Sequence, residues 1–238
     1  MVSTVIKNWD NKTWLSSKNY IKSFNEFLIR NIKLNSNSKI LDIGCGRGKI
    51  LGNLSSNLKL KNKPLGIDII DHKDRDKRIK FKKISASSFF LKKNYKFDLI
   101  LIKQTIHLLK NNQIKKLISI CKSKLNPNGK ILILSLDPKN NEIPSFSLMN
   151  NKLQKSFKRD KKILELISKI YPKIITKYFV FDVKILRNKY TQMIKNRYIS
   201  TLLNLTNKQI ADGIKEINTT FKKEVKFRDR LICLIISK

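Results

Sequence analysis

The sequence predicts an α/β fold in which a doubly wound, mostly parallel sheet of seven strands carries helices on both faces. Short β-branched and apolar runs alternate with helix-like stretches between residues 38 and 136, which is the pattern of a parallel sheet. The first of these runs passes directly into a glycine-rich turn. The length of 238 residues suffices for one such domain with its own core, so we expect a single domain over residues 1–238.

The elements of the first half are expected in a regular order. The first 34 residues read as helical because Trp14, Tyr20 and Phe24 recur at helical spacing. Five strands follow, at residues 39–43, 64–69, 79–84, 97–102 and 130–136. The helices between them are expected at residues 48–58, 87–93 and 111–124. A turn from Asn126 to Gly129 precedes the fifth strand.

The pattern changes after the core of residues 38–136, and residues 137–225 form a mainly helical insert. Its expected elements are helices at 150–171 and 188–204, a strand at 177–186 and one more helix near the end. Thr206 and Gln209 fit a capping box that opens this last helix. Residues 226–238 are expected to supply the final strand.

The chain is strongly basic, with 52 Lys and Arg against 17 acidic residues and a formal net charge of +35. Lys, Asn and Ile together fill 102 of the 238 positions, and their A/T-rich codons explain this bias without a function. Arg, the better bidentate ligand for phosphate and guanine, is not enriched. The charge therefore favours a solvated lysine surface, with a polyanionic partner as the alternative. Asp229, between Arg228 and Arg230, reads as part of a charge-balanced strand edge.

Several classes of protein are excluded by the composition. The cysteines (Cys45, Cys121 and Cys233) stand singly, without the spacing of a metal site, and indicate a reducing cytoplasm. No apolar run approaches the roughly 20 residues of a membrane span, and residues 1–10 lack the pattern of a signal peptide. We expect a cytoplasmic protein with no bound metal and no membrane association.

The glycines are concentrated after the first strand, where four of the seven stand: Gly44, Gly46, Gly48 and Gly52. Glycine permits positive φ angles and lets a ligand approach the backbone at the start of the next helix. A phosphate-binding loop would need Ser or Thr in place of Ile50. The dinucleotide fingerprint would need glycine in place of Lys49 or Leu51. Neither pattern is therefore present.

An acidic residue accompanies this loop, because the second strand ends at Asp68, 22 residues beyond Gly46. A carboxylate at the end of the second strand can accept hydrogen bonds from a ribose diol. The loop and Asp68 together indicate a nucleoside ligand that has a ribose and no pyrophosphate.

These residues resemble the class I S-adenosylmethionine-dependent methyltransferases. Residues 40–48 are similar to the first motif of this family, and residues 66–68 are similar to its second. Residues 97–108 and 125–133 are similar to its fourth strand with the following helix start, and to its next turn and strand. The resemblance covers about residues 38–136. It implies a Rossmann-like fold, S-adenosyl-L-methionine as the cofactor and S-adenosyl-L-homocysteine as the product.

The resemblance also implies the cofactor contacts. The methionine part is expected to face Asp42, Gly44, Cys45 and Gly46, and Asp68 is expected to hold the ribose hydroxyls. The further contacts that we expect are Ile69, Ser85, Ala86 and Lys103. The family usually has an acidic residue after its third strand, near the adenine amino group. Ser85 stands there in this sequence and would have to accept that hydrogen bond.

The sequence says less about the acceptor of the methyl group than about the cofactor. Amino-methylating enzymes of nucleic acids carry Asn/Asp-Pro-Pro-aromatic after the fourth strand, and residues 102–105 lack it. A cytosine-C5 enzyme needs a cysteine near that strand, and none is placed there. His107 follows the fourth strand and is the candidate catalytic residue, either as a general base or as part of the pocket wall. His72 lies in a charged loop and is expected to be solvated.

The N-terminal segment and the insert resemble the cap elements that close over small substrates in this superfamily. The candidate acceptor-binding residues are His107 and five residues of these caps: Trp14, Tyr20, Tyr190, Arg197 and Tyr198. Arg197 could bind a carboxylate with two hydrogen bonds. We therefore expect methyl transfer to a small molecule, with a carboxylate-bearing metabolite as the candidate. The alternatives are a tRNA or rRNA methyltransferase, and a cofactor-binding protein without catalysis.

Overall fold

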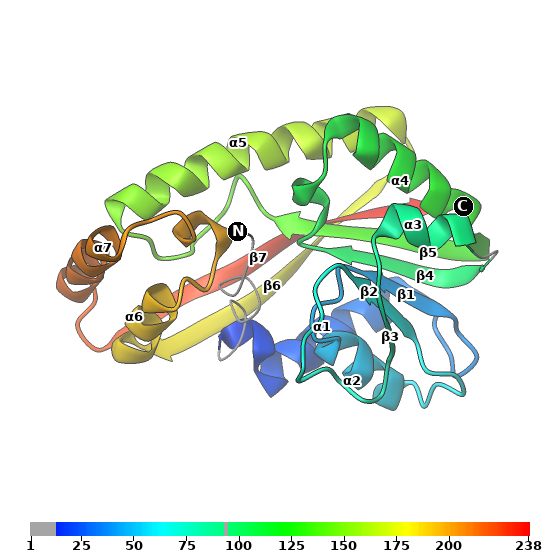
Figure 1. Ribbon diagram of the computed structural model, residues 1–238, viewed down its shortest axis with the longest axis horizontal. Helices are drawn as coiled ribbons and strands as arrows, with labels where there is room; N and C mark the ends of the chain where they lie inside the picture. The colour runs from blue at the N-terminus through cyan, green and yellow to red at the C-terminus, as the bar shows by residue number, and fades with distance from the viewer. Residues whose placement is uncertain (1–12, 93–94) are drawn as a thin grey trace.

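The computed structural model describes residues 13–92 and 95–238, and its seven strands form one sheet (Figure 1). The strand order is β3-β2-β1-β4-β5-β7-β6. The strands are β1 (Ile40–Ile43), β2 (Leu65–Asp68), β3 (Lys80–Lys83), β4 (Phe97–Lys103), β5 (Leu125–Leu136), β6 (Ile175–Leu186) and β7 (Glu224–Ser237). The predicted fold class is confirmed, and the helix and strand types agree with the expected order.

The first five strands run parallel, with β1 between β2 and β4. Asp42 of β1 stands beside Gly66 of β2 and Leu101 of β4. β1 is wholly buried and β4 nearly so, because both faces of this part of the sheet are covered. The carboxyl ends of these strands share one edge of the sheet, where a doubly wound fold binds its ligand.

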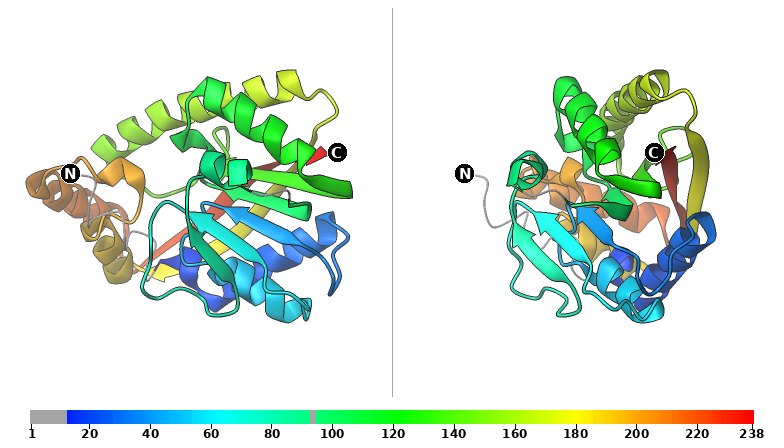
Figure 2. Two further views of the ribbon diagram at one scale, coloured as in Figure 1. Left: turned by 45° about the vertical axis from the view of Figure 1, so that its right-hand side comes forward. Right: turned by 90° about the vertical axis from the view of Figure 1, so that its right-hand side faces the viewer.

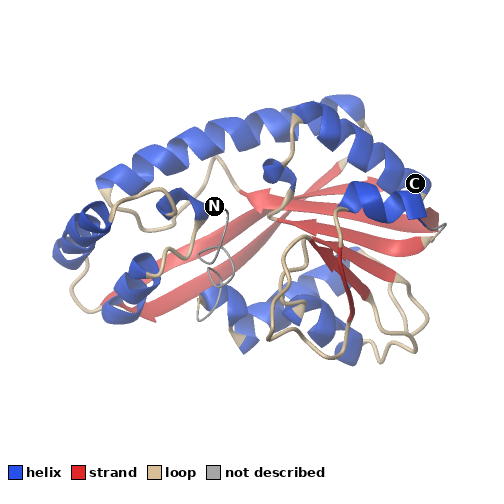
Figure 3. Cartoon of the chain, in the orientation of Figure 1, coloured by secondary structure: helices blue, strands red, loops and turns tan. Residues whose placement is uncertain are grey.

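The last two strands run antiparallel to their neighbours, and β7 lies between β5 and β6. Leu231 of β7 pairs with Leu136 at the carboxyl end of β5, while Asp229 pairs with Phe181 of β6. The β6–β7 ribbon therefore continues past the end of β5 and projects beyond the rest of the sheet (Figure 3). This arrangement carries β7 residues to the edge where the parallel strands end.

Helices cover both faces of the sheet (Figure 2). α1 (Lys18–Asn31) and α2 (Lys49–Asn57) pack on one face, and α3 (Ala86–Lys92), α4 (Asn111–Ser123) and the second half of α5 (Ser147–Ile170) pack on the other. α6 (Arg187–Lys195) and α7 (Asn207–Thr220) lie at the far end of the β6–β7 ribbon (Figure 1).

The start of α1 illustrates how the sequence determines these positions. Ser17 caps the helix, because its side chain accepts a hydrogen bond from the Tyr20 backbone amide. Tyr20, Phe24 and Leu28 follow at intervals of four residues and are all fully buried. This apolar stripe fixes α1 against the sheet and against Phe179 of β6.

Three local expectations differ from the structure. The helix expected at 188–204 ends at Lys195, because Arg197 takes a left-handed φ of 52° and a short 3-10 turn follows at Ser200–Leu202. Residues 126–129 interrupt the register inside β5 instead of preceding the strand. Only residues 14–16 and 18–31 of the first 34 are helical among those described, and residues 1–12 lie outside the described part.

None of the described helices combines the length and the apolar content that crossing a membrane requires.

Candidate active site

The glycine-rich loop between β1 and α2 is held against the neighbouring strand. The amides of Gly44 and Cys45 both donate to the carbonyl of Ile67, at 2.8 and 3.2 Å. Gly44, Gly46 and Gly48 have φ angles of 75°, 54° and 68°, which glycine adopts without strain. A Cβ at Gly44 would lie 2.3 Å from the Thr105 hydroxyl oxygen, whereas one at Gly46 would meet no atom within 4 Å. The loop is thus packed at its first glycine and open at its second.

Asp68 lies at the open part of this loop. Its Oδ2 accepts a hydrogen bond from the Gly46 amide at 2.9 Å, and its Oδ1 accepts one from the Ile70 amide at 2.9 Å. These two bonds fix the carboxylate at the end of β2 while the side chain remains partly accessible. Ile69 beside it is 65% exposed, which is unusual for a large apolar side chain next to a buried strand.

Ser85 lies between β3 and α3, where its hydroxyl takes part in hydrogen bonds within the turn. Its Oγ accepts a hydrogen bond from the Ser88 amide at 3.2 Å, as in a helix N-cap. The same oxygen lies within 3.0 Å of the hydroxyls of Ser87 and Ser88. Ala86 is the first residue of α3.

A buried polar cluster lies on the sheet face that α1 covers. Asp42 is 5% exposed, and burial raises its pKa to about 7, although the nearby Lys103 ammonium opposes the rise. The Lys103 Nζ lies 5.4 Å from the centre of the Tyr20 ring and donates to the Gln104 side chain at 3.1 Å. Gln104 itself has a left-handed φ of 52° at the end of β4. Such backbone strain is typical of functional sites.

Asp229 of β7 belongs to the same cluster and corrects the expectation of an exposed strand edge. Its side chain is 1% exposed and accepts a hydrogen bond from the Trp14 indole N–H at 2.9 Å. Burial raises its pKa, while the Trp14 hydrogen bond, the Lys103 charge and a hydrogen bond with Tyr20 lower it. The flanking arginines point elsewhere, since Arg228 binds Glu142 and Arg230 binds Asp137. The strand alternation would have revealed this, because Asp229 shares its face with the apolar Phe227 and Leu231.

The two histidines differ in their surroundings. His107 lies in a 3-10 turn (Ile106–Leu108) after β4. Burial lowers the pKa of its imidazole, and the charge of Arg159 lowers it further, whereas the Asp160 carboxylate of α5 raises it. Burial therefore favours the neutral form of the imidazole. His72 is 7% exposed and not solvated as expected.

The expected acceptor residues of the insert are well packed. Tyr190 and Tyr198 are buried, their hydroxyl oxygens lie 2.9 Å apart, and the Tyr190 hydroxyl also donates to the Pro144 carbonyl. The Trp14 ring packs edge-on against Tyr198 with ring centres 5.2 Å apart. Arg197 donates from Nη2 to the Leu205 carbonyl and the Asn207 side chain, at 2.9 Å each. The structure therefore brings Trp14, Tyr190 and Tyr198 together, whereas Tyr20 packs against Phe179 and Phe181 and Arg197 is directed elsewhere.

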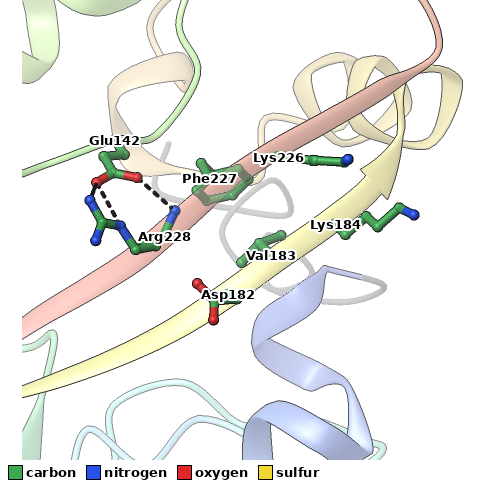
Figure 4. A pocket seen from close by; sticks show the side chains of 7 residues that line it. All are labelled: Glu142, Asp182, Val183, Lys184, Lys226, Phe227 and Arg228. Carbon is green, nitrogen blue, oxygen red and sulfur yellow. Dashed lines mark hydrogen bonds and ion pairs between the residues drawn. The ribbon is translucent and has the colours of Figure 1, made fainter.

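One pocket lies away from this site. It measures about 380 Å³ and lies on the β6–β7 ribbon (Figure 4), lined by Glu142, Asp182, Val183, Lys184, Lys226, Phe227 and Arg228. Its charges largely compensate one another, because Glu142 binds Arg228 and Lys184 pairs with Glu224 at 3.2 Å. A second pocket of about 290 Å³ lies between α3 and α4. Neither contains a residue of the glycine loop, so we locate the site from the loop and the buried cluster.

Comparisons with known proteins place the chain in a family. A family model described as a methyltransferase domain matches residues 17–165. No curated protein is significantly similar to the chain in sequence.

Solved structures agree with the family assignment at the level of the fold. The plantazolicin methyltransferase BpumL, in complex with a monoazolic desmethylPZN analog and SAH, has a TM-score of 0.55 and 16% identity over 98% of this chain and 88% of its own. A putative methyltransferase from Bacillus halodurans C-125 has a TM-score of 0.55 and 16% identity over 91% and 99% of the two chains. A SAM-dependent methyltransferase from Archaeoglobus fulgidus has a TM-score of 0.52 and 18% identity over 92% of this chain and 94% of its own. The chain therefore belongs to the methyltransferase domain family, the class I S-adenosylmethionine-dependent methyltransferases.

Proposed function

We propose that this chain transfers the methyl group of S-adenosylmethionine to a small-molecule acceptor enclosed beneath α1 and the insert. The observation that carries the proposal is the open glycine loop with a carboxylate fixed on it. Asp68 is held by the Gly46 amide at 2.9 Å, and a Cβ added at Gly46 would meet no atom within 4 Å. This combination suits a ligand that presents hydroxyl donors to a carboxylate and lies against bare backbone.

The residues at the loop fit the cofactor. We assign the methionine part to Asp42, Lys103 and the backbone of Gly44, Cys45 and Gly46, because charged side chains and open backbone meet there. Asp68 would accept from the ribose hydroxyls with its remaining lone pairs. The exposed side chain of Ile69 would cover one face of the adenine, and Ser85 and Ala86 would border its edge.

The cofactor, when bound, supplies a methyl group on a sulfonium. The contribution of the chain is to hold the acceptor in line with that methyl group and to exclude water. A base is needed only if the acceptor arrives protonated. His107 remains the candidate for this role, because its lowered pKa keeps the imidazole able to accept a proton at pH 7.

The enclosure of the acceptor side supports a small molecule. Trp14 lies over the carboxyl edge of the sheet and packs against Phe227 of β7 as well as Tyr198, with ring centres 5.1 and 5.2 Å apart. Tyr190 contacts Tyr198 through a hydrogen bond between their hydroxyl groups. BpumL, which shares the fold, was crystallised with desmethylPZN analogs. A carboxylate clamp by Arg197 would require its two hydrogen bonds to Leu205 and Asn207 to be exchanged.

The test uses S-adenosylmethionine labelled in the methyl group, a cell extract, and separation of metabolites, RNA and protein after the reaction. We expect the label in the metabolite fraction. Label in RNA would overturn the small acceptor and give the charge of +35 a function. Tight cofactor binding without label in any fraction would instead support a cofactor-binding protein that lacks catalysis.

A further inference from the structure

We infer that Gln104 is a positioning residue for the cofactor: its left-handed backbone turns its side-chain amide onto the ammonium of Lys103 and holds that charge for the carboxylate of the methionine part. This role rests on the proposed function, in which Lys103 meets the methionine part, and it concerns a residue outside the predicted site residues. Three observations lead to it: a backbone angle, a hydrogen bond and the packing of the turn around both.

The backbone of Gln104 is unusual for its place in the fold. Among the described residues, Lys59, Gln104 and Arg197 are the three other than glycine with a positive φ, at 48°, 52° and 52°. Lys59 and Arg197 each follow the C-cap of a helix, where a left-handed residue commonly ends the helix. Gln104 follows the strand β4 instead, so no helix end accounts for its angle. Strain of this kind persists only where the surrounding structure imposes it.

The left-handed angle changes where the side chain of Gln104 points. Along a regular strand, neighbouring side chains point to opposite faces of the sheet. Lys103 lies on the face that α1 covers, since its Nζ is 5.4 Å from the centre of the Tyr20 ring and 5.5 Å from that of Phe24. A regular continuation would turn Gln104 to the opposite face, yet its Oε1 accepts a hydrogen bond from Lys103 Nζ at 3.1 Å. The strained turn thus brings two adjacent side chains together.

The turn is fixed to β5 and to the glycine loop. The Gln104 amide donates to the Leu134 carbonyl at 2.7 Å, and the Thr105 hydroxyl donates to the Lys103 carbonyl at 3.0 Å. The side chain of Thr105 also fills the space beside Gly44, where a Cβ would lie 2.3 Å from its oxygen. Within the described part of the chain, Lys103 and Gln104 remain partly accessible. The position of the ammonium is therefore coupled to the loop that holds the cofactor.

The surroundings of the ammonium suit a cation that is kept for an anionic group. A lysine side chain is flexible, and holding it in one place costs conformational entropy. The amide oxygen of Gln104 fixes the ammonium without neutralising it, and so do the aromatic rings of α1. Burial raises the pKa of Asp42 to about 7 and raises that of Asp229, although the Lys103 charge lowers both. Near pH 7 Asp42 is thus only partly ionised, and the ammonium retains charge for a carboxylate of the cofactor.

The experiment compares two nucleosides that differ in their amino-acid part. S-adenosylhomocysteine carries the carboxylate, whereas 5′-methylthioadenosine has the same adenosine and sulfur without it. Calorimetry uses the full chain and the variant Gln104→Leu, which removes the amide at similar size. We expect this variant to bind S-adenosylhomocysteine about tenfold more weakly and to bind 5′-methylthioadenosine within about twofold of the wild type.

The contrary outcomes are distinct. Equal weakening of both nucleosides would show a general disturbance of the loop, and unchanged binding of S-adenosylhomocysteine would leave Gln104 without a part in it. Either result would overturn the inference while the proposed function stands. If the wild type binds neither nucleoside, the proposed function fails and the inference fails with it.

A double-mutant cycle shows whether Gln104 acts through Lys103. Lys103→Met removes the ammonium, and we expect it to weaken binding of S-adenosylhomocysteine about tenfold or more. Gln104→Leu should add almost nothing in that background, because the two residues contribute through one contact. A second tenfold loss in the double variant would mean that Gln104 acts independently of Lys103, and would overturn the inference.

Relief of the strain supplies a matched control. Gln104→Gly and Lys59→Gly each replace a left-handed residue with glycine, so we expect both to keep the Tm at or above that of the wild type. Lys59 is exposed at the end of α2, and its variant should bind S-adenosylhomocysteine as the wild type does. Gln104→Gly should lose affinity about tenfold, as Gln104→Leu does. A lowered Tm in Gln104→Gly, or the same loss of affinity in Lys59→Gly, would assign the strain to folding and contradict the positioning role.

Discussion

Three glycines in the loop after β1 have similar backbone angles but different neighbours. A Cβ at Gly44 would collide with Thr105, and one at Gly48 would lie 2.2 Å from the Ile79 side chain. At Gly46 it would point into free space. The first and third glycines are therefore required by packing, whereas the second is free for a ligand.

Gly46→Ala should consequently separate cofactor binding from stability. The left-handed angle makes alanine unfavourable by about 1–2 kcal/mol, so we expect a modest fall in Tm. The added methyl group would occupy the cofactor space, and we expect calorimetry to show no binding of S-adenosylmethionine. Gly48→Ala is the contrasting variant and should lower the Tm further because of Ile79. Unchanged affinity in Gly46→Ala would remove this loop from the cofactor site.

Asp68→Ala should weaken binding of S-adenosylhomocysteine by about 1–3 kcal/mol, because the ribose hydroxyls would lose their buried acceptor. The titration is compared with Asp71→Ala, an exposed aspartate in the next loop that pairs with Arg75. Equal affinities in the two variants would mean that the ribose lies elsewhere.

The ionisation of Asp42 should be visible in the pH dependence of stability. Its pKa rises from an ordinary value of 3.8 to about 7 in the folded protein. Between these values the folded state binds more protons than the unfolded state, so stability falls as the pH rises from about 4 to 7. The contribution is on the order of 2–4 kcal/mol. We expect Asp42→Asn to have a flatter Tm profile over this range, and identical profiles would contradict the assigned pKa.

At the scale of the elements, the segment after α6 depends on one arginine. Arg197 has a left-handed φ, and its guanidinium binds both Leu205 and Asn207 at the start of α7. Arg197→Ala removes these bonds, and we expect a loss of about 1 kcal/mol in the free energy of unfolding, measured by urea denaturation. A raised KM for an anionic acceptor with unchanged stability would favour the carboxylate clamp instead.

Local signals predicted most of the elements. β1 and α2 lie where the apolar run and the glycines placed them, and Thr206 and Gln209 form the predicted capping box. The break at Arg197 was not predictable, because an arginine in the left-handed region is held there by partners eight and ten residues away in the sequence. The burial of Asp229 was missed because arginines flank it on both sides, although the alternation of β7 places it on the same face as Phe227 and Leu231.

The cofactor half of the site was easier to predict than the acceptor half. Asp42, the glycines and Asp68 lie within one stretch of the sequence, and the loop conformation brings Gly46 and Asp68 into contact. Trp14 and Tyr20, Lys103, and Asp229 come from three distant segments of the chain. Their proximity is a property of the sheet order, which no local pattern contains.

On the scale of the whole molecule, the net charge of +35 should act against the folded state through self-repulsion. Raising sodium chloride from 0.1 to 1 M shortens the screening length from about 10 to about 3 Å. We therefore expect the Tm to rise with salt, measured by scanning calorimetry. Chloride is preferred to sulfate because sulfate stabilises proteins by exclusion from their surface. A Tm that falls with added salt would show that attractive ion pairs outweigh the repulsion.

The hydrogen bond between Trp14 and Asp229 spans 215 residues of the chain. Because synthesis proceeds from the N-terminus, β1 to β5 can assemble on the ribosome while β7 does not yet exist. During this interval the outer edge of β5, which includes Ile131 to Leu134, has no strand beside it, and an unpaired apolar edge of this kind is prone to aggregation. The strands that flank the glycine loop are thus synthesised well before the strand that carries Asp229.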